Sequence, residues 1–288
     1  MACIDSQKSE QRIAVLITCY NRKDTTLACL KTLFGQVLPS QVRLDVYLVD
    51  DASTDGTSDA VRQTFPTVHI LNGSGLLYWS GGTRLAWQQA LKKQYCYYLW
   101  LNDDTCLTPN ALDILLAVDK TAQKIVVGSC CDPITGEHTY GGRIRRNTRI
   151  QLPTEPILPE DRPIHCETMN GNIVLVPQFV VDTVGILSSE YTHTIGDVDY
   201  GLRAQKAGLS VLVAPGYLGK CARHKQIAAW TDPHTSLLKR LKNMCEPKGF
   251  PPREWYVYVR RHTGYQWPFY FVKPFVRVLF PWLWPASY

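Results

Sequence analysis

The sequence predicts an α/β protein built on a doubly wound, mostly parallel sheet, followed by a helical, aromatic C-terminal extension. Short apolar runs alternate with segments of helical periodicity, and the connections between them are short. Such alternation is typical of a parallel sheet, because each crossover helix covers one sheet face. With 288 residues, 45% of them hydrophobic, the chain can bury a substantial core.

Four apolar runs in the first 118 residues are each followed by a segment with helical spacing. We expect strands at 13–18, 46–49, 68–71 and 97–101, and helices at 25–34, 57–65, 85–93 and 109–118. Thr108 is the expected N-cap of the last of these helices, with Pro109 in its first turn.

The pattern then loosens, with Gly and Pro punctuation and a Pro-rich stretch that we interpret as substrate-facing loops. We expect a strand at 125–129, a hairpin around Tyr140–Arg143, a strand at 173–176, helices at 178–184 and 197–207, and a strand at 209–214. Gly208 is the expected stop of the second of these helices.

Charge divides the chain into a polar segment (1–12), a body (13–225) and a basic, aromatic extension (226–288). From residue 220 onward, twelve Lys and Arg face three Asp and Glu, a net charge of +9, whereas the residues before it carry −3. The first residues show no secretory signal, so we expect a cytoplasmic protein. The ten cysteines include no C-x-x-C pair, which favours reduced thiols and no zinc site.

Polar residues follow three of the predicted strands at the point where each strand ends. The first strand continues into TCYN (18–21), the second into DDASTDGT (50–57) and the fourth into NDD (102–104). Carboxyl ends of parallel strands meet at one edge of a sheet, where open α/β folds bind ligands, so we expect one shared crevice. Adjacent carboxylates there suit a divalent cation that binds a diphosphate. The alternatives are solvated turns and helix capping.

The chain contains neither a G-x-G-x-x-G fingerprint nor a Walker loop, so phosphate binding would need a metal or basic side chains. NGSG (72–75) and SGGTR (80–84) allow close backbone approach before a helix N-terminus. Arg84 is then placed to meet a phosphate or the acidic crevice. A flexible loop with a surface arginine is the alternative.

Five segments, in this order, resemble family 2 glycosyltransferases of the Rossmann-like GT-A fold: ITCYNR, LVDDASTDGT, the Gly-Gly stretch before a helix, WLNDD and GDVDYGLR. The resemblance covers roughly residues 13–224 and is greatest to bacterial rhamnosyl- and galactofuranosyl-transferase relatives. It implies a nucleotide-sugar-binding half (13–125) and an acceptor-binding half (126–225).

The resemblance implies roles for the polar residues of the crevice. Donor or nucleotide contacts are implied for Thr18, Tyr20, Asn21, Asp51, Arg84, Asn102 and Asp103, and acceptor-side contacts for Trp79, Asn170, Gly171 and Asn172. The resemblance implies that Asp104 is the chief ligand of a Mn²⁺ or Mg²⁺ ion, with Asp103 and His224 as supporting ligands. Asn102 stands where the family's D-x-D-like motif has its first acid.

Asp197 is the candidate catalytic base. The GDVDYGLR segment matches the one in which such enzymes place their base, and helix geometry helps to choose between its two acids. Asp199 and Arg203 are four residues apart and can pair on one face, whereas Asp197 lies about 200° away around the helix axis. The alternative is that Asp197 only caps the helix. The implied reaction is a single displacement with inversion.

The resemblance implies a nucleoside-diphosphate-sugar donor, with UDP or dTDP favoured, and a glycan or polyprenyl-linked glycan acceptor in polysaccharide biosynthesis. Aromatic and basic residues in 267–288 suit the surface of a bilayer, so we expect possible binding at the inner face of the plasma membrane. The alternative is that these residues pack on the body or on another subunit. We expect no nucleic acid partner, because no recognition motif accompanies the charge. A sugar nucleotidyltransferase and a non-catalytic glycan-binding subunit are the alternative functions.

Overall fold

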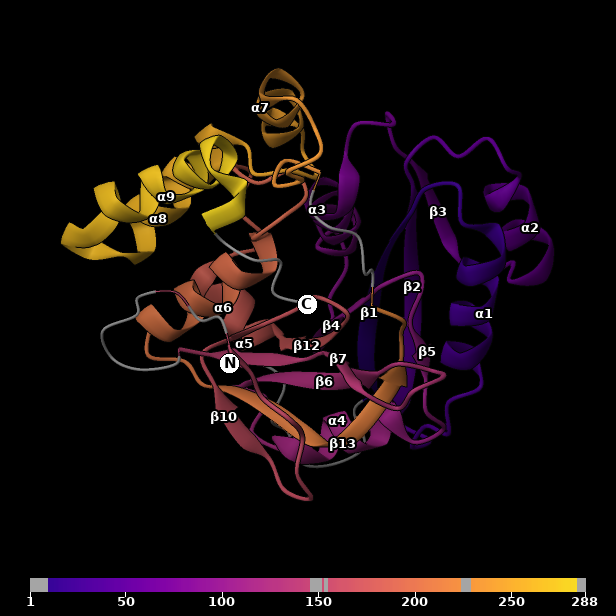
Figure 1. The fold of residues 1–288 in the computed structure, drawn as a ribbon. Coiled ribbons are helices and arrows are strands. Elements are labelled where there is room, and N and C mark those ends of the chain that lie inside the picture. Colours follow the sequence, from indigo (N-terminus) through magenta and orange to yellow (C-terminus); the bar gives the residue numbers. More distant parts are fainter. Residues whose placement is uncertain (1–9, 146–151, 153–154, 224–228, 284–288) are drawn as a thin grey trace.

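The computed structural model describes residues 10–145, 152, 155–223 and 229–283, and its central element is a twisted, mostly parallel sheet (Figure 1). Its strands follow the order β10-β13-β6-β12-β4-β1-β2-β3, with β5 paired to β13 and β7 to β6. Their bounds are β1 Gln11–Cys19, β2 Val42–Asp50, β3 His69–Asn72, β4 Tyr97–Leu101, β5 Cys106–Leu107, β6 Ile125–Cys131, β7 His138–Tyr140, β10 Ile164–Cys166, β12 Ile173–Pro177 and β13 Val211–Lys220. A small second sheet has the order β11-β8-β9, formed by Thr168–Met169, Gly142–Ile144 and Glu155–Pro156.

Helices cover both faces of the main sheet, whose central strands bury apolar side chains on both sides. The helices of the body are α1 Lys23–Phe34, α2 Thr57–Thr64, α3 Tyr78–Ala90, α4 Ala111–Val118, α5 Gln178–Val184 and α6 Gly196–Lys206. One core contains side chains of α1, α2 and α4, packed on Val15 and Leu99. The other contains side chains of α3, α5 and α6, packed on Leu16 and Trp100. Successive strand residues therefore point into opposite layers, which confirms the predicted α/β class.

The strand β12 is antiparallel to both of its neighbours, β4 and β6, within an otherwise parallel part of the sheet. Its first residue, Ile173, pairs with Leu101, the last residue of β4. The chain just before β12 therefore lies at the same edge as the carboxyl ends of β1, β2 and β4.

The structure corrects three local predictions. The helix expected at 85–93 begins at Tyr78, because the Asp51 carboxylate accepts hydrogen bonds from amides at its start. The helix α4 begins after Asn110, since the Thr108 hydroxyl donates to a backbone carbonyl of β13 instead. Finally, no hairpin joins the segments around Tyr140–Arg143, because β7 pairs with β6 whereas β8 pairs with β9 and β11.

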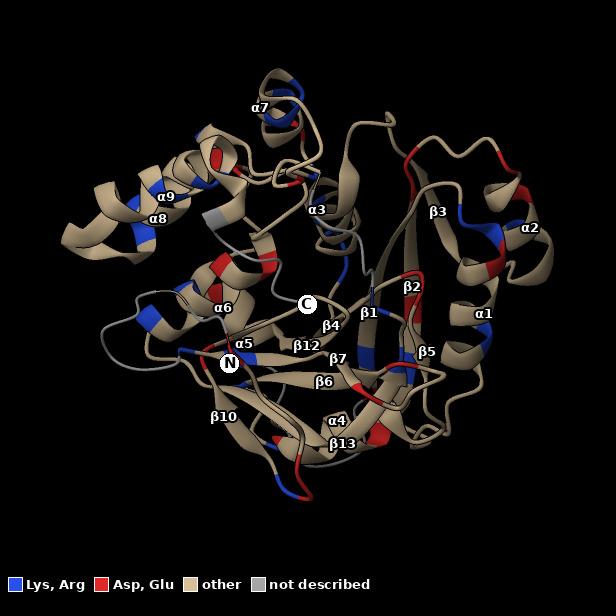
Figure 2. Cartoon of the chain, viewed as in Figure 1, with Lys and Arg blue, Asp and Glu red and all other residues tan. Residues whose placement is uncertain are grey.

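The C-terminal extension forms a helical lobe beside α6 (Figure 1), made of α7 Leu237–Cys245, α8 Pro252–His262 and α9 Trp267–Leu279. The helix α8 packs against α9, and the indole Nε1 of Trp255 donates to the Tyr270 carbonyl at 3.0 Å. Positions occupied by Lys and Arg lie along the helices of this lobe (Figure 2). Among the described residues, no helix combines the length and apolarity needed to cross a bilayer.

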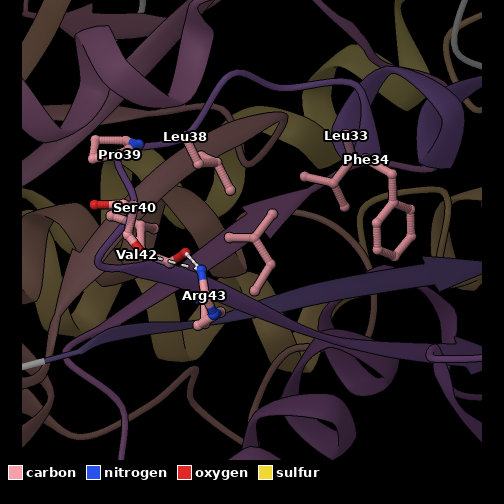
Figure 3. A pocket seen from close by; sticks show the side chains of 8 residues that line it. Leu33, Phe34, Leu38, Pro39, Ser40, Val42 and Arg43 are labelled. Carbon is pink, nitrogen blue, oxygen red and sulfur yellow. Dashed lines mark hydrogen bonds between the residues drawn. The ribbon is translucent and has the colours of Figure 1, made fainter.

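A shallow hollow lies between the end of α1 and the beginning of β2 (Figure 3). Leu33, Leu38, Val42 and Leu44 contribute apolar lining, and the Arg43 guanidinium donates to two backbone carbonyls at its margin. Since β2 begins here and ends at Asp50, this hollow lies at the sheet edge opposite the predicted crevice.

Candidate active site

Two segments far apart in sequence meet at the carboxyl edge of β4. The amide of Asn102 donates to the Asn172 carbonyl at 3.1 Å, and the Asn172 side chain lies 3.4 Å from the Thr105 hydroxyl. The Cys221 thiol, 3.4 Å from Asp104 Oδ1, adds the end of β13 to the same edge. The antiparallel course of β12 therefore brings the expected acceptor-side segment onto the acidic motif.

Asp103 and Asp104 share one basic partner, Arg22, which precedes the first turn of α1. Arg22 Nη1 lies 2.7 Å from Asp104 Oδ2 and 3.2 Å from Asp103 Oδ1. Burial raises the pKa of Asp103 to about 7, although the charge of Arg22 opposes the shift. Asp103 Oδ2 is buried, with no hydrogen-bond partner among the described residues. This corner thus contains a buried carboxylate oxygen that can accept another ligand.

The predicted metal ligands are only partly described. Within the described ranges, no group of three or more His, Cys, Asp and Glu side chains is placed to bind a metal ion. His224 lies outside the described residues. The structure therefore supplies two adjacent carboxylates from the expected set. That number is enough where substrate phosphates and waters complete the coordination of a Mg²⁺-like ion.

Both carboxylate oxygens of Asp51 bind backbone amides of the loop between β3 and α3. Oδ1 accepts from Gly75 at 2.7 Å, and Oδ2 accepts from Leu77 and Tyr78, each at 2.9 Å. A Cβ at Gly73 would lie 2.5 Å from Asp51 Oδ1, so the loop passes very close to this side chain. Asp51 therefore fixes the loop and the start of α3, and its contact with the nucleoside stays a prediction.

The end of β1 supplies the expected donor-side residues. The Asn21 side chain accepts from the Thr54 amide at 2.7 Å, which ties the loop after β1 to the loop after β2. Tyr20 is 54% exposed and available to a ligand. Thr18 packs on α3, where a Cβ at Gly82 would lie 2.3 Å from Thr18 Cγ2, so the Gly-Gly stretch permits this close approach.

Arg84 does not point into the crevice, where the sequence predicted it. Its Nη1 donates to the carbonyls of Ser188 at 2.8 Å and Tyr191 at 3.3 Å, in the segment before α6. Burial lowers the pKa of this guanidinium. Arg22 is the arginine that meets the acids, although sequence reasoning did not select it. Its position directly after TCYN, at a strand end, was the available signal.

Asp197 is linked to the acidic motif through two intermediate residues. Its Oδ2 accepts from the Gly171 amide at 2.9 Å. Gly171 in turn lies against the indole of Trp79, where an added Cβ would be 2.2 Å from Cζ2. The Trp79 Nε1 donates to Asn102 Oδ1 at 2.7 Å. Four residues chosen from the sequence thus form one connected group.

The electrostatic environment of Asp197 favours a stronger base than an ordinary aspartate. Burial raises the pKa of its carboxyl, although hydrogen bonds from the Val198 and Gly171 amides oppose the shift. The neighbouring acid differs, because Asp199 pairs with Arg203 at 2.9 Å, as the helix geometry predicted. Asp199 is therefore the paired acid of the motif. Among the described residues, no cationic side chain lies at salt-bridge distance from Asp197.

Unusual backbone conformations accumulate around this edge. Among the described non-glycine residues with positive φ, four lie at the ends of elements that border it: Asn21 (50°), Ala52 (66°), Tyr78 (51°) and Ile195 (57°). Left-handed conformations are disfavoured for such side chains, above all for β-branched Ile195. Strain of this kind is common at functional sites, where the surrounding structure maintains it.

The family model described as "Glycosyl transferase family 2" matches residues 14–175, which is more than half of the chain. The chain belongs to glycosyl transferase family 2. The matched region contains the ends of β1, β2 and β4, the first turn of α3 and the Asn170–Asn172 segment. It ends before α6, so Asp197 lies outside it. No curated protein sequence matches the chain.

Solved structures share the fold of this family 2 chain at low sequence identity. The mannosyltransferase PcManGT from Pyrobaculum calidifontis, in complex with GDP-Man and Mn²⁺, matches with a TM-score of 0.54 and 15% identity, over 88% of this chain and 65% of that one. TarS of S. aureus matches with a TM-score of 0.53 and 14% identity, over 87% and 42%. The chain thus spans less than two thirds of either protein, and the predicted GT-A fold is confirmed.

Proposed function

We propose that this chain is a metal-dependent, inverting glycosyltransferase. In this proposal it transfers a sugar from a nucleoside-diphosphate-sugar to a hydroxyl of a glycan or lipid-linked glycan, in the synthesis of a cell-surface polysaccharide. The observation that carries the proposal is the connected group Asp197, Gly171, Trp79 and Asn102. It joins a carboxylate with a raised pKa to the acidic motif at one edge of the sheet.

The proposed chemistry divides between two carboxylate groups. Asp197 accepts the proton of the acceptor hydroxyl as its oxygen attacks the anomeric carbon, and the amides of Gly171 and Val198 fix the orientation of its carboxylate. On the donor side, Asp103 and Asp104 would bind Mn²⁺ or Mg²⁺, and the unpartnered Asp103 Oδ2 fits this role. The cation supplies positive charge to the diphosphate leaving group.

Arg22 has a place in this scheme as a basic side chain between the two acids. In the described structure it neutralises part of their charge. If these two acids held a cation, Arg22 would be free to contact a diphosphate oxygen in the same crevice. The complex of the Pyrobaculum protein with GDP-Man and Mn²⁺ supports a nucleotide-sugar and a divalent cation. For the nucleotide of the donor we propose UDP or dTDP.

The deciding experiment is release of nucleoside diphosphate from a panel of UDP-, dTDP- and GDP-sugars, with Mn²⁺ or with EDTA. We expect metal-dependent turnover of one donor, lost in Asp104→Ala and reduced about 10²- to 10⁴-fold in Asp197→Asn. Asp113→Ala, at an exposed acid on α4, is the matched control. Donor binding without turnover, unchanged in Asp197→Asn, would support a glycan-binding subunit instead. A chain that leaves these donors intact but forms pyrophosphate from a nucleoside triphosphate and a sugar 1-phosphate would be a nucleotidyltransferase.

We further propose that the enzyme works at the inner face of the plasma membrane, with α9 on the lipid. Its exposed side chains include Phe269 (69%), Val272 (51%) and Leu279 (43%), whose spacing places them on one helix face. The opposite face, with Tyr270 and Val278, is buried on the protein. An apolar face beside basic side chains suits an anionic bilayer surface.

Vesicle flotation tests the membrane proposal. The double variant Phe269→Ser/Val272→Ser is expected to lose binding to anionic vesicles, and neutral vesicles are expected to bind the wild type weakly. Ile134→Ser is the matched control, since Ile134 is 93% exposed on a loop outside the C-terminal lobe. Binding that is equal for both variants would contradict the proposal, and a concentration-dependent dimer lost in the double variant would assign α9 to a subunit interface.

A further inference from the structure

The carboxylate of Asp199 is a buried meeting point of three segments of the chain. Its side chain is fully buried and accepts four hydrogen bonds. Arg203 Nε lies at 2.9 Å, Arg261 Nη1 at 2.7 Å, His262 Nε2 at 2.8 Å and the Tyr191 hydroxyl at 3.1 Å. The partners come from α6 itself, from the segment before it and from α8 in the C-terminal lobe.

The beginning of α6 depends on these contacts, because local sequence provides little to fix it. Ile195 occupies the N-cap position in a left-handed conformation, and its side chain makes no capping hydrogen bond. Asp197 and Asp199 both lie in the first turn of this helix. An aliphatic N-cap cannot supply the side-chain acceptor that usually orders a helix start, and within the first turn the Val198 amide donates to Asp197 Oδ1 instead. The position of Asp197 is therefore set by tertiary contacts.

The segment before α6, which contacts Asp199, is also hydrogen-bonded to α3. The carbonyl of Tyr191 accepts from Arg84, and that of Thr192 accepts from the amide of Ser80, both on α3. Tyr191 is also the residue whose hydroxyl binds Asp199. The network therefore joins α8, the first turn of α6 and the first turns of α3.

We propose that Arg261 and His262 are positioning residues for the reaction, acting through Asp199 to orient Asp197. The inference rests on the proposed role of Asp197 as base. In this view the C-terminal lobe completes the active site, because α8 supplies two of the four hydrogen bonds that fix Asp199. A base displaced by about 1 Å can cost on the order of 10²-fold in rate, so small shifts of α6 are sufficient.

Arg261→Ala and Arg260→Ala in the full chain form a matched pair of tests. Arg260 is the adjacent arginine of α8, but its guanidinium lies over the Trp267 ring, 5.0 Å from the centroid, and not on Asp199. We expect Arg261→Ala to lower kcat roughly 10- to 100-fold with KM for the donor nearly unchanged, and Arg261→Lys to recover part of the loss. Arg260→Ala should keep kcat within about twofold.

A double-mutant cycle separates positioning from a merely structural effect. If Arg261 acts through Asp197, Arg261→Ala should cause little further loss of kcat in the Asp197→Asn background. A full multiplicative loss, or equal losses in the Arg260 and Arg261 variants, would overturn the proposal. Should Arg261→Ala fail to fold, His262→Gln, which retains an amide donor, and His262→Ala provide the same comparison.

Amide hydrogen exchange in residues 196–202 gives a readout that does not use catalysis. We expect faster exchange in Arg261→Ala than in Arg260→Ala, because the first turn of α6 loses its restraint. Unchanged exchange would overturn the positioning role. If Asp197→Asn were fully active while exchange in Arg261→Ala still increased, the assigned base would be wrong and the restraint of α6 by α8 would stand.

Discussion

Replacing Gly171 with alanine tests the connection between the proposed base and the acidic motif. A Cβ built at this position would lie 2.2 Å from Trp79 Cζ2 and 2.5 Å from Cη2. Carbon atoms pack at about 3.5 Å or more, so the backbone and the indole must separate by about 1.3 Å. Both sides of that contact make hydrogen bonds on which the proposed mechanism depends, Gly171 to Asp197 and Trp79 to Asn102. Either movement disturbs the site.

The expected effect on catalysis follows from that distance. The Gly171 amide lies 2.9 Å from Asp197 Oδ2, and a shift of about 1 Å takes it beyond hydrogen-bond range. We expect kcat to fall on the order of 10²-fold, measured as nucleoside diphosphate release at saturating donor and acceptor. The affinity for Mn²⁺ and nucleotide should change much less, because Asp103 and Asp104 are not displaced.

Gly136→Ala is the control for Gly171→Ala. Gly136 has φ +73° and no atom within 4 Å of an added Cβ, so its substitution strains a distant turn without a clash. It should lower the free energy of unfolding by about 1 kcal/mol and leave kcat unchanged. If Gly171→Ala kept kcat within about threefold of the wild type, the proposed link between Asp197 and Trp79 would be refuted.

Three further predictions concern the same edge of the sheet. Burial raises the pKa of Asp197, and the proposed base works only when ionised. As the pH is lowered, kcat should therefore begin to fall at a higher pH than for an ordinary aspartate, whose pKa is about 3.9. If the same fall in kcat at low pH persisted in Asp197→Asn, this assignment would be contradicted. Gly82→Ala should lower the free energy of unfolding by about 1–3 kcal/mol in denaturant titration, and Thr18→Ser, which removes the clashing methyl, should restore part of it. Arg22→Met should raise the Mn²⁺ affinity of the donor-free protein about three- to tenfold, measured by electron paramagnetic resonance, and an unchanged affinity would show that the ion pair does not compete with metal.

Local patterns in the sequence were enough for the strands and helices that have strong periodicity. The predicted strand at 97–101 and helix at 178–184 have the bounds found for β4 and α5. The helix with the acidic pair was also predicted, together with the pairing of Asp199 and Arg203, because side chains four residues apart on a helix are neighbours whatever surrounds them.

The predicted bounds were wrong where a residue far away in the sequence determines the local structure. The start of α3 is set by the Asp51 carboxylate, 27 residues before Tyr78, and no residue adjacent to Tyr78 shows this. The direction of β12 was likewise undetermined, since an apolar strand buried on both faces has the same pattern in a parallel or an antiparallel setting. That direction decides whether residues 170–172 reach the acidic motif.

Periodicity and short motifs are local properties of the chain, and they were sufficient for the α/β class, the family and the list of polar residues at strand ends. The packing of the elements sets which of these residues meet: Asp197 with Gly171, Trp79 with Asn102, and Arg22 with the two acids. It also placed Arg84 and Asp51 on backbone groups. Contacts between residues far apart in the chain depend on how elements pack, and neither composition nor spacing encodes that packing locally.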